Sequence, residues 1–254
     1  MDPNTHQQAY DRGSTIFSPD GRLYQVEYAR EAVERGAPSV GVVTDDGVVL
    51  AARKRLRSPL LEAETVEKLY DVDDHLAVAA AGHAADARQL VDVARRAGQR
   101  QRLRYGEPIG VAPLATRLAD HVQEHTQTGG SRPYGSALLV AGVDPETGSD
   151  AGSPRLYEVD PGGTSTGWRA AAIGHGADER RRFFEEQLPE SSTDGTGRTL
   201  QRGATVALEA LAATAEDALT TATVDLLAID STATIDRYST DDLEATLADA
   251  GVGS

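Results

Sequence analysis

Residues 39–52 read SVGVVTDDGVVLAA. Two short runs rich in valine flank the tripeptide at 45–47, whose Asp and Gly residues are typical of tight turns between antiparallel strands. The stretch therefore predicts a β-hairpin with strands at 39–43 and 48–52. A second hairpin is expected from Lys68–Val72 and His75–Ala81, joined at Asp73-Asp74.

Helical periodicity appears on both sides of these hairpins. Apolar residues recur every three or four positions in two successive segments: Ala87, Leu90, Val91, Ala94 and Ala97 in the first, then Val111, Leu114, Leu118 and Val122. Another helix is expected from about Ser18-Pro19-Asp20 to Val33. The remaining predictions are strands at 136–141, 155–159, 165–173, 224–229 and 233–238, and helices at 177–187, 199–213 and 241–250.

The order of these elements excludes alternating βαβ units. Hairpins joined by pairs of helices predict an α+β fold, in which antiparallel sheets pack face to face and helices cover their outer faces. We therefore expect a four-layer αββα sandwich, formed by one domain over residues 14–254. Residues 1–13 are polar and contain Pro3 and Gly13, so they are expected to form a flexible arm. The loops at 145–154 and 189–198 are expected at the surface.

Composition narrows the classes of function. The chain has 254 residues, a net charge of −15 and no cysteine. This acidity opposes binding to nucleic acid or anionic lipid, and the lack of cysteine excludes disulfides and thiolate metal sites. No run of about 18 apolar residues predicts a membrane span, and residues 1–8 lack an apolar signal core, so a cytoplasmic protein is expected.

Lysine is nearly absent. It occurs only at positions 54 and 68, and the other 23 basic residues are arginine. Together with the dispersed acidic residues, this pattern favours a protein kept soluble in strong salt, where charge repulsion is screened over a few ångströms. The alternative is a GC-rich genome, which favours arginine codons.

Residues 10–35 read YDRGSTIFSPDGRLYQVEYAREAVER, a long segment without gaps. It closely resembles the N-terminal signature of archaeal 20S proteasome α subunits. Similar family patterns follow at 82–88 (GHAADAR), 129–135 (GGSRPYG) and 172–174 (AIG). The resemblance covers about residues 8–240 and implies the Ntn-hydrolase sandwich with an N-terminal extension and helix, in agreement with the order of elements.

The resemblance also implies the assembly and its partners. Proteasome α subunits form the outer seven-membered rings of an α-β-β-α stack, bind β subunits, admit unfolded protein substrates and dock a proteasome-activating AAA ATPase. No cofactor is implied. The family's gate residues correspond here to Tyr10, Asp11, Pro19 and Tyr28. The alternative for these four residues is an ordinary helix entry with a surface tyrosine.

The pocket for the C-terminal tail of the ATPase is implied from the same resemblance. The matching residues are Lys68, Gly82, Gly21, Arg22 and Glu27. Lysine is a compact charge that can receive a carboxylate, and glycine allows close approach of a chain. The alternative for Lys68 is a solvated charge at the end of a strand. His83 borders this pocket, and the basic cluster at 53–57 either faces a neighbouring subunit or is solvated.

Catalysis by this chain is not expected. In this fold the nucleophile is a threonine that begins the mature chain directly before the first strand. The corresponding place holds Ala37-Pro38-Ser39, and Thr15 follows Ser14 inside the α signature. The alternatives are a self-processing threonine hydrolase of the same fold and a free-standing α ring that acts as a scaffold.

One motif matches the pattern of a different class of enzyme. Residues 121–125 read HVQEH, which matches an inverted zinc-peptidase pattern with two His ligands and a Glu base. No third ligand is identifiable, so we expect a solvated helix face and no metal site.

Overall fold

The computed structural model describes residue 17 and residues 21–127, 132–144, 152–188, 199–215 and 217–253. The expected arm at 1–13 and most of the 145–154 loop lie outside these residues. The helices are α2 (Tyr24–Glu34), α3 (Ala84–Tyr105), α4 (Val111–Gln127), α5 (Ala177–Gln187), α6 (Leu200–Ala212) and α7 (Thr240–Asp249). The strands are β1 (Ser39–Val43), β2 (Gly47–Arg53), β3 (Leu69–Asp73), β4 (Leu76–Gly82), β5 (Ser136–Val143), β6 (Pro154–Val159), β7 (Ser165–Trp168), β8 (Ala170–Ile173), β9 (Val224–Asp230) and β10 (Ile235–Arg237).

The strands form two antiparallel sheets of five. Their orders are β10-β9-β2-β1-β8 and β3-β4-β5-β6-β7. The hairpin at 39–52 is confirmed, with Ser39 paired to Ala52 and Val43 to Val48. The second hairpin, β3–β4, begins the other sheet. Each sheet therefore contains one of the two hairpins that the sequence predicts.

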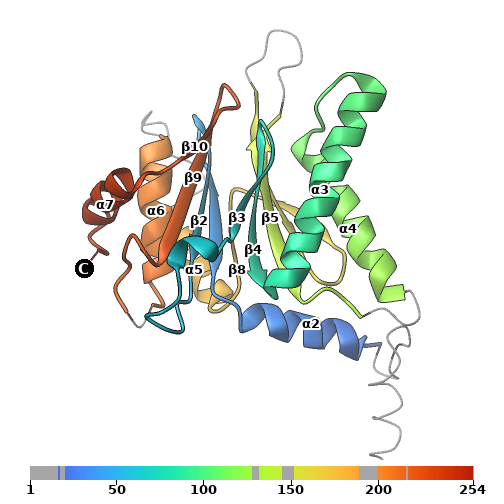
Figure 1. The fold of residues 1–254 in the computed structure, drawn as a ribbon, viewed down its shortest axis with the longest axis horizontal. Helices are drawn as coiled ribbons and strands as arrows, with labels where there is room; N and C mark the ends of the chain where they lie inside the picture. The colour runs from blue at the N-terminus through green and yellow to red at the C-terminus, as the bar shows by residue number, and fades with distance from the viewer. Residues whose placement is uncertain are drawn as a thin grey trace, which may run out of the picture.

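Three apolar layers alternate with the sheets. Leu50, Leu139 and Ile229 belong to the layer between the two sheets, whose faces are lined largely by alanine and leucine. Leu90 and Leu118 belong to the layer beneath α3 and α4, while α5, α6 and α7 cover the opposite sheet. Figure 1 shows the same arrangement, with helices on both outer faces of the paired sheets. The four-layer αββα sandwich is confirmed.

Helix α2 belongs to neither outer layer. It crosses one end of the sandwich, below both sheets in Figure 1, and buries only Val26, Ala29 and Val33. Glycine lets it approach the sheet closely, because a Cβ on Gly36 would stand 2.4 Å from the backbone nitrogen of Gly82. The helix thus closes the end of the sandwich at which β1 begins.

One predicted strand is wrong. The segment 165–173 forms two strands in different sheets, since β7 pairs with β6 and β8 pairs with β1. The chain crosses between the sheets at Arg169, whose carbonyl accepts a hydrogen bond from the Val43 amide at 2.8 Å. Residues 170–173 are small and mostly buried, whereas 165–168 lie at an open edge, and this difference in burial separates the two strands.

Helix α2 begins at Tyr24, later than the predicted start near residues 18–20, which lie outside the described residues. The other predicted elements match within a few residues. Strand β10 is shorter than predicted because only Ile235–Arg237 pairs with β9. No helix among the described residues is long and apolar enough to cross a membrane.

Candidate functional site

The site is built around the turn from α2 into β1. Lys68 lies directly before β3, and its Nζ is directed inward at this turn. It donates hydrogen bonds to the carbonyls of Ala37, Pro38 and Arg53 at 2.6, 2.9 and 3.1 Å. These acceptors match the three N–H donors of an ammonium group. The solvated alternative for Lys68 is therefore wrong, because its charged end is held inside the chain.

Burial controls the charge of this lysine. Loss of hydration lowers the pKa of Lys68 to about 7, the nearby Asp225 carboxylate raises it, and Arg180 lowers it further. Asp225 also binds Lys54 Nζ at 2.7 Å, so both lysines of the chain converge on one carboxylate. A small change of pH around neutrality therefore changes the charge of Lys68, which lies beside the residues that lead into β1.

Arg180 is a second buried cation, which the sequence reasoning missed. Its side chain is fully buried on α5 and donates to the carbonyls of His175, Gly176 and Leu211 at 2.6, 3.0 and 3.2 Å. Burial and Arg53 lower the pKa of Arg180 to about 10, which leaves it charged at neutral pH. One residue thus joins the β8–α5 turn to the end of α6. Phe184, one helical turn on and also buried, indicates this face of α5.

Gly82 closes the other side of the site. Its φ of +104° is rare for residues with a side chain, and a Cβ there would stand 2.3 Å from the Gly135 carbonyl oxygen. Glycine is thus required by the packing of this chain on itself. His83, half of whose side chain is exposed, follows at the start of α3 with Nδ1 3.4 Å from Asp86 Oδ1.

The other residues expected in the pocket lie at the opposite end of α2. Arg22 and Glu27 form a two-fold ion pair of 2.6 and 2.5 Å beside Gly21, whose φ is +74°. Helix α2 has 11 residues and hence spans about 16 Å. One chain therefore holds two separate groups, Lys68 with Gly82 at the end of α2 and Gly21, Arg22 and Glu27 at its beginning.

Only one of the four expected gate residues is described. Tyr28 lies on α2 with 46% of its surface exposed. Tyr10, Asp11 and Pro19 lie outside the described residues.

The head of β1 lacks the chemistry of a threonine hydrolase. Ser39 is buried, and its hydroxyl donates to the Ala80 carbonyl at 2.8 Å. It follows Pro38 through an ordinary peptide bond, so it has no free α-amine that could act as a base.

The HVQEH motif is not a solvated face, contrary to expectation. His121 and His125 are half-buried, and the Nε2 atom of each lies within hydrogen-bonding distance of the Tyr134 hydroxyl, at 3.1 and 3.3 Å. His125 Nδ1 donates to the His121 carbonyl at 3.0 Å. Among the described residues, no group of three or more His, Cys, Asp or Glu side chains is arranged to hold a metal ion.

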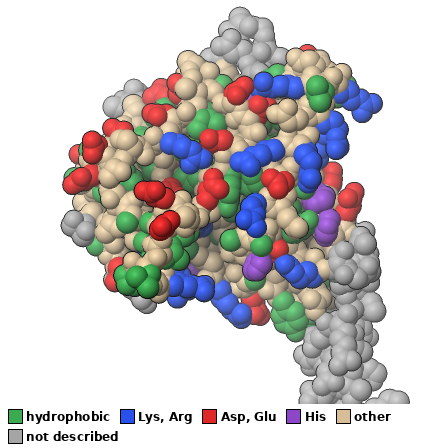
Figure 2. Space-filling model, in the orientation of Figure 1, with side chains coloured by type: hydrophobic (Ala, Val, Ile, Leu, Met, Phe, Trp, Pro, Cys, Tyr) green, Lys and Arg blue, Asp and Glu red, His purple; other side chains and the backbone are tan. Residues whose placement is uncertain are grey.

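The basic cluster at 53–57 divides between two environments. Lys54 is buried against Asp225, whereas Arg55 and Arg57 are exposed in the loop between β2 and β3. Figure 2 shows basic and hydrophobic side chains near this loop, at the lower left of the face in view.

Comparison with known proteins covers nearly the whole chain. The model of the proteasome subunit family matches residues 33–229, and the model of the N-terminal signature of A-type proteasome subunits matches residues 10–32. Proteasome subunit alpha 2 of Haloarcula marismortui is 51% identical over 248 residues, which cover 97% of each chain. Proteasome subunit alpha 1 of Haloferax volcanii is 50% identical over 97% of this chain and 94% of its own length. Proteasome subunit alpha of Haloquadratum walsbyi is 51% identical, covering 98% of this chain and 95% of its own.

Proposed function

This chain belongs to the proteasome subunit family, as an α-type member similar to those of haloarchaea, and from this we propose that it forms the outer seven-membered ring of a 20S core particle, gates substrate entry and docks a regulatory ATPase. Alpha-type subunits are the non-catalytic subunits of the proteasome, and the buried Ser39 at the head of β1 agrees with that role. Peptide hydrolysis then takes place on partner β subunits.

The separation of the two pocket groups carries the proposal for docking. Lys68 and Gly82 lie at one end of α2, and Gly21, Arg22 and Glu27 lie at the other. A complete pocket forms when the beginning of one α2 meets the end of the α2 of its neighbour, so the pocket belongs to the ring. Its ligand is an ATPase tail that ends in a hydrophobic residue, a tyrosine and a free carboxylate.

Lys68 supplies the charge in this pocket. Its three N–H donors already bind carbonyl groups, so a tail carboxylate either displaces one of these acceptors or is attracted across a short gap. Displacement would release the Ala37–Pro38 turn, which directly follows α2. That connection offers a route from the occupied pocket to α2 and to the N-terminal segment before it.

The gate is proposed to use that N-terminal segment. Residues 1–13 act as the arm, Pro19 fixes the turn before α2, and Tyr10, Asp11 and Tyr28 hold the arm open through contacts with neighbouring subunits. Residues 14–254 form the single domain of the ring, and the assembly works in the cytoplasm on unfolded proteins.

Assembly and activity together test this function. The chain is expressed alone and with a β subunit, and particles are measured by native mass spectrometry, electron microscopy and hydrolysis of a fluorogenic peptide. We expect inactive seven-membered rings from the chain alone and active four-ring particles with β. A stable monomer that ignores β, or peptidase activity of the chain alone, would overturn the proposal.

Docking is tested by Lys68→Ala in the assembled particle. A peptide with the C-terminal sequence of an ATPase tail should stimulate the wild type but not the variant, while assembly is retained. Arg182→Ala, an exposed position on α5, is the matched control and should respond like the wild type. Full stimulation of Lys68→Ala would refute the pocket.

A further inference from the structure

Three ring side chains converge between α4 and the segment that enters β5, and the proposed function uses none of them. His121 and His125 lie one turn apart on the same face of α4, with their ring centres 4.6 Å apart. The hydroxyl oxygen of Tyr134 lies 3.1 Å from Nε2 of His121 and 3.3 Å from Nε2 of His125. Two imidazole nitrogens and one phenol oxygen are thus gathered at one place.

The hydrogen bonds assign the proton on each imidazole ring. Nδ1 of His125 donates to the His121 carbonyl at 3.0 Å, which leaves Nε2 of His125 with a lone pair. The Tyr134 hydroxyl then donates to that nitrogen and accepts from Nε2 of His121. A histidine that binds a metal through one nitrogen usually donates its other N–H to a carbonyl or carboxylate. His125 is therefore already oriented as a ligand.

The spacing of the three donor atoms fits a tetrahedral metal ion. Zinc binds imidazole nitrogen and oxygen at about 2.1 Å, so two ligand atoms of a tetrahedral site lie about 3.4 Å apart. The distances of 3.1 and 3.3 Å from Tyr134 to the two histidines are close to this value. Zinc-binding helices also carry their two histidines at positions i and i+4. Because no third His, Cys, Asp or Glu in the described part of the chain completes a metal-binding group, the phenol oxygen supplies the third donor.

Tyr134 is fixed from the side opposite the histidines. Only 7% of its surface is exposed, and the amide of the next residue, Gly135, donates to the buried carboxylate of Asp86 at 2.8 Å. His121 and His125 are half-buried, so an ion and a water ligand can reach their nitrogens from solvent. A fixed oxygen behind two accessible nitrogens needs little rearrangement to bind an ion.

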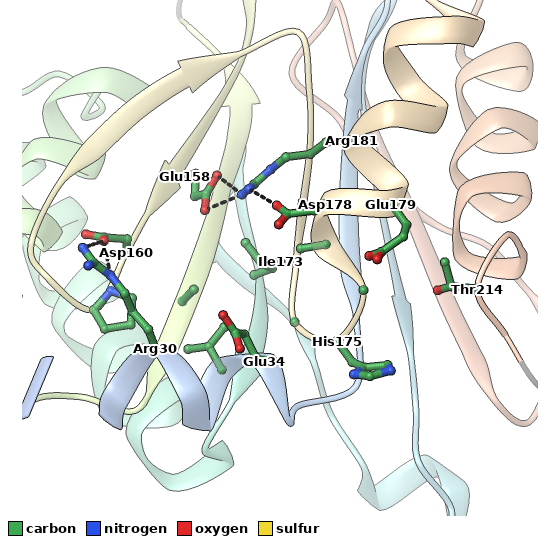
Figure 3. A pocket seen from close by; sticks show the side chains of 16 residues that line it. Arg30, Glu34, Glu158, Asp160, Ile173, His175, Asp178, Glu179, Arg181 and Thr214 are labelled. Atoms are coloured by element: carbon green, nitrogen blue, oxygen red, sulfur yellow. Dashed lines mark hydrogen bonds and ion pairs between the residues drawn. The ribbon is translucent and has the colours of Figure 1, made fainter. Parts of the chain in front are cut away.

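Carboxylates that could compete for cations gather at a separate place. An acidic cavity of about 610 Å³ lies between α2 and α5, and none of the three ring residues lines it. Figure 3 shows Glu34 and Glu179 beside this cavity, one from each helix. Carboxylates suit Mg²⁺ and Ca²⁺, whereas imidazole suits Zn²⁺ and Cu²⁺. An excess of Mg²⁺ therefore occupies the carboxylates and leaves the histidines free.

We propose that His121, His125 and Tyr134 form a binding site for one divalent transition-metal ion, Zn²⁺ or Cu²⁺, with water as the remaining ligand. When the ion binds, the ring proton of His121 moves from Nε2 to Nδ1, so that both histidines bind through Nε2. The bound ion joins α4 to the segment that enters β5. The proposal departs from the expectation that residues 121–125 bind no metal, and it is independent of the proposed ring, gate and ATPase pocket.

Calorimetry on the full-length chain without an affinity tag tests the site. Zn²⁺ is titrated in an excess of Mg²⁺, and we expect one ion per chain. His121→Gln and His125→Gln should each lower the affinity by at least about tenfold, since loss of even an outer partner of a metal ligand has an effect of that size. Tyr134→Phe should weaken binding less than either histidine variant, because water can replace the phenol oxygen. Circular dichroism shows which variants are folded.

Two controls match these variants. His175→Gln removes an exposed histidine before α5, and Glu34→Gln with Glu179→Gln removes two carboxylates from the acidic cavity. Both should bind Zn²⁺ like the wild type. Electron paramagnetic resonance of the wild-type chain with one equivalent of Cu²⁺ needs no variant, and its spectrum should show coupling to two imidazole nitrogens.

Several results would overturn the site. They are coupling of Cu²⁺ to fewer than two nitrogens, unchanged Zn²⁺ affinity in folded His121→Gln and His125→Gln chains, and Zn²⁺ binding that excess Mg²⁺ abolishes. Loss of binding in the variant of Glu34 and Glu179 would assign the ion to the acidic cavity and overturn the site as well. None of these results affects the proposed function, which is tested by assembly with β.

Discussion

Arg132 binds Asp86 through two hydrogen bonds, 2.6 Å from Nη1 to Oδ2 and 2.7 Å from Nη2 to Oδ1. The Gly135 amide donates to the same carboxylate at 2.8 Å. Asp86 lies in the first turn of α3, so this contact joins the helix to the segment that enters β5. It holds Gly82, at the end of β4, close to Gly135, which directly precedes β5.

Asp86→Asn should lower the free energy of unfolding by about 2 kcal/mol at pH 7, because a buried carboxylate with three charge-assisted or backbone donors is lost. Urea unfolding measures the effect. Asp74→Asn is the control, since the Asp74 side chain is 85% exposed and also binds an arginine. Equal effects of the two substitutions would show that burial of Asp86 contributes nothing.

The contact between Arg132 and Asp86 also predicts how the free energy of unfolding changes at acidic pH. Burial raises the pKa of Asp86, but the hydrogen bonds from Arg132 and Gly135 outweigh burial and hold it below its usual value. A carboxyl with a lowered pKa in the folded state adds stability above the pKa of the unfolded chain and loses it as pH falls. The difference between wild type and Asp86→Asn should therefore shrink below about pH 4. A constant difference down to pH 2 would contradict this account.

Gly82→Ala should destabilise the chain by about 3 kcal/mol, because it adds a Cβ against the Gly135 carbonyl at a positive φ. Gly106→Ala is the control, with a φ of +75° but open space around its Cβ, and should cost only about 1 kcal/mol. Thermal unfolding compares the two variants. A stable Gly82→Ala chain that loses only its response to the tail would show that this glycine serves the pocket alone.

Stimulation by the ATPase tail should weaken as pH rises through about 7. Lys68 has a pKa of about 7, so it carries its charge below that pH and loses it above, while the tail carboxylate stays ionised throughout. The measurement is peptide hydrolysis by the assembled particle with and without tail peptide from pH 6 to 8.5. Activity without the peptide corrects for titration of the β subunits. A stimulation ratio that stays level or rises with pH would exclude Lys68 as the receiving charge.

Arg180→Met should lower the free energy of unfolding by about 3 kcal/mol, since it leaves the buried carbonyls of His175, Gly176 and Leu211 without their donor. Arg180→Lys should recover little, because an ammonium cannot reproduce the planar fork of donors. The exposed Arg182→Met is the control and should change stability by less than about 0.5 kcal/mol. Denaturant unfolding of all three variants decides whether this buried cation stabilises the fold.

Much of the fold could be read from local patterns. The hairpin at 39–52 depends on neighbouring residues, and the periodic apolar faces of α3 and α4 are buried as predicted. The break at Arg169 could not be read in this way, because only this one residue separates β7 from β8, and the local pattern does not show that the two strands join different sheets. Pairing between distant strands is decided by the packing of whole layers.

For the site, the sequence determined which residue types were available: two lysines among 25 basic residues, glycines at 21 and 82, and no threonine at the head of β1. Three features depend on tertiary packing: Lys68 turns inward onto three carbonyls, Arg180 is the buried arginine of α5, and the residues proposed for the pocket lie at opposite ends of α2. The physical reason is the distance along the chain over which each interaction acts. Turn chemistry and helical periodicity act over a few neighbouring residues, whereas burial, pKa and the meeting of distant backbones depend on how complete layers pack.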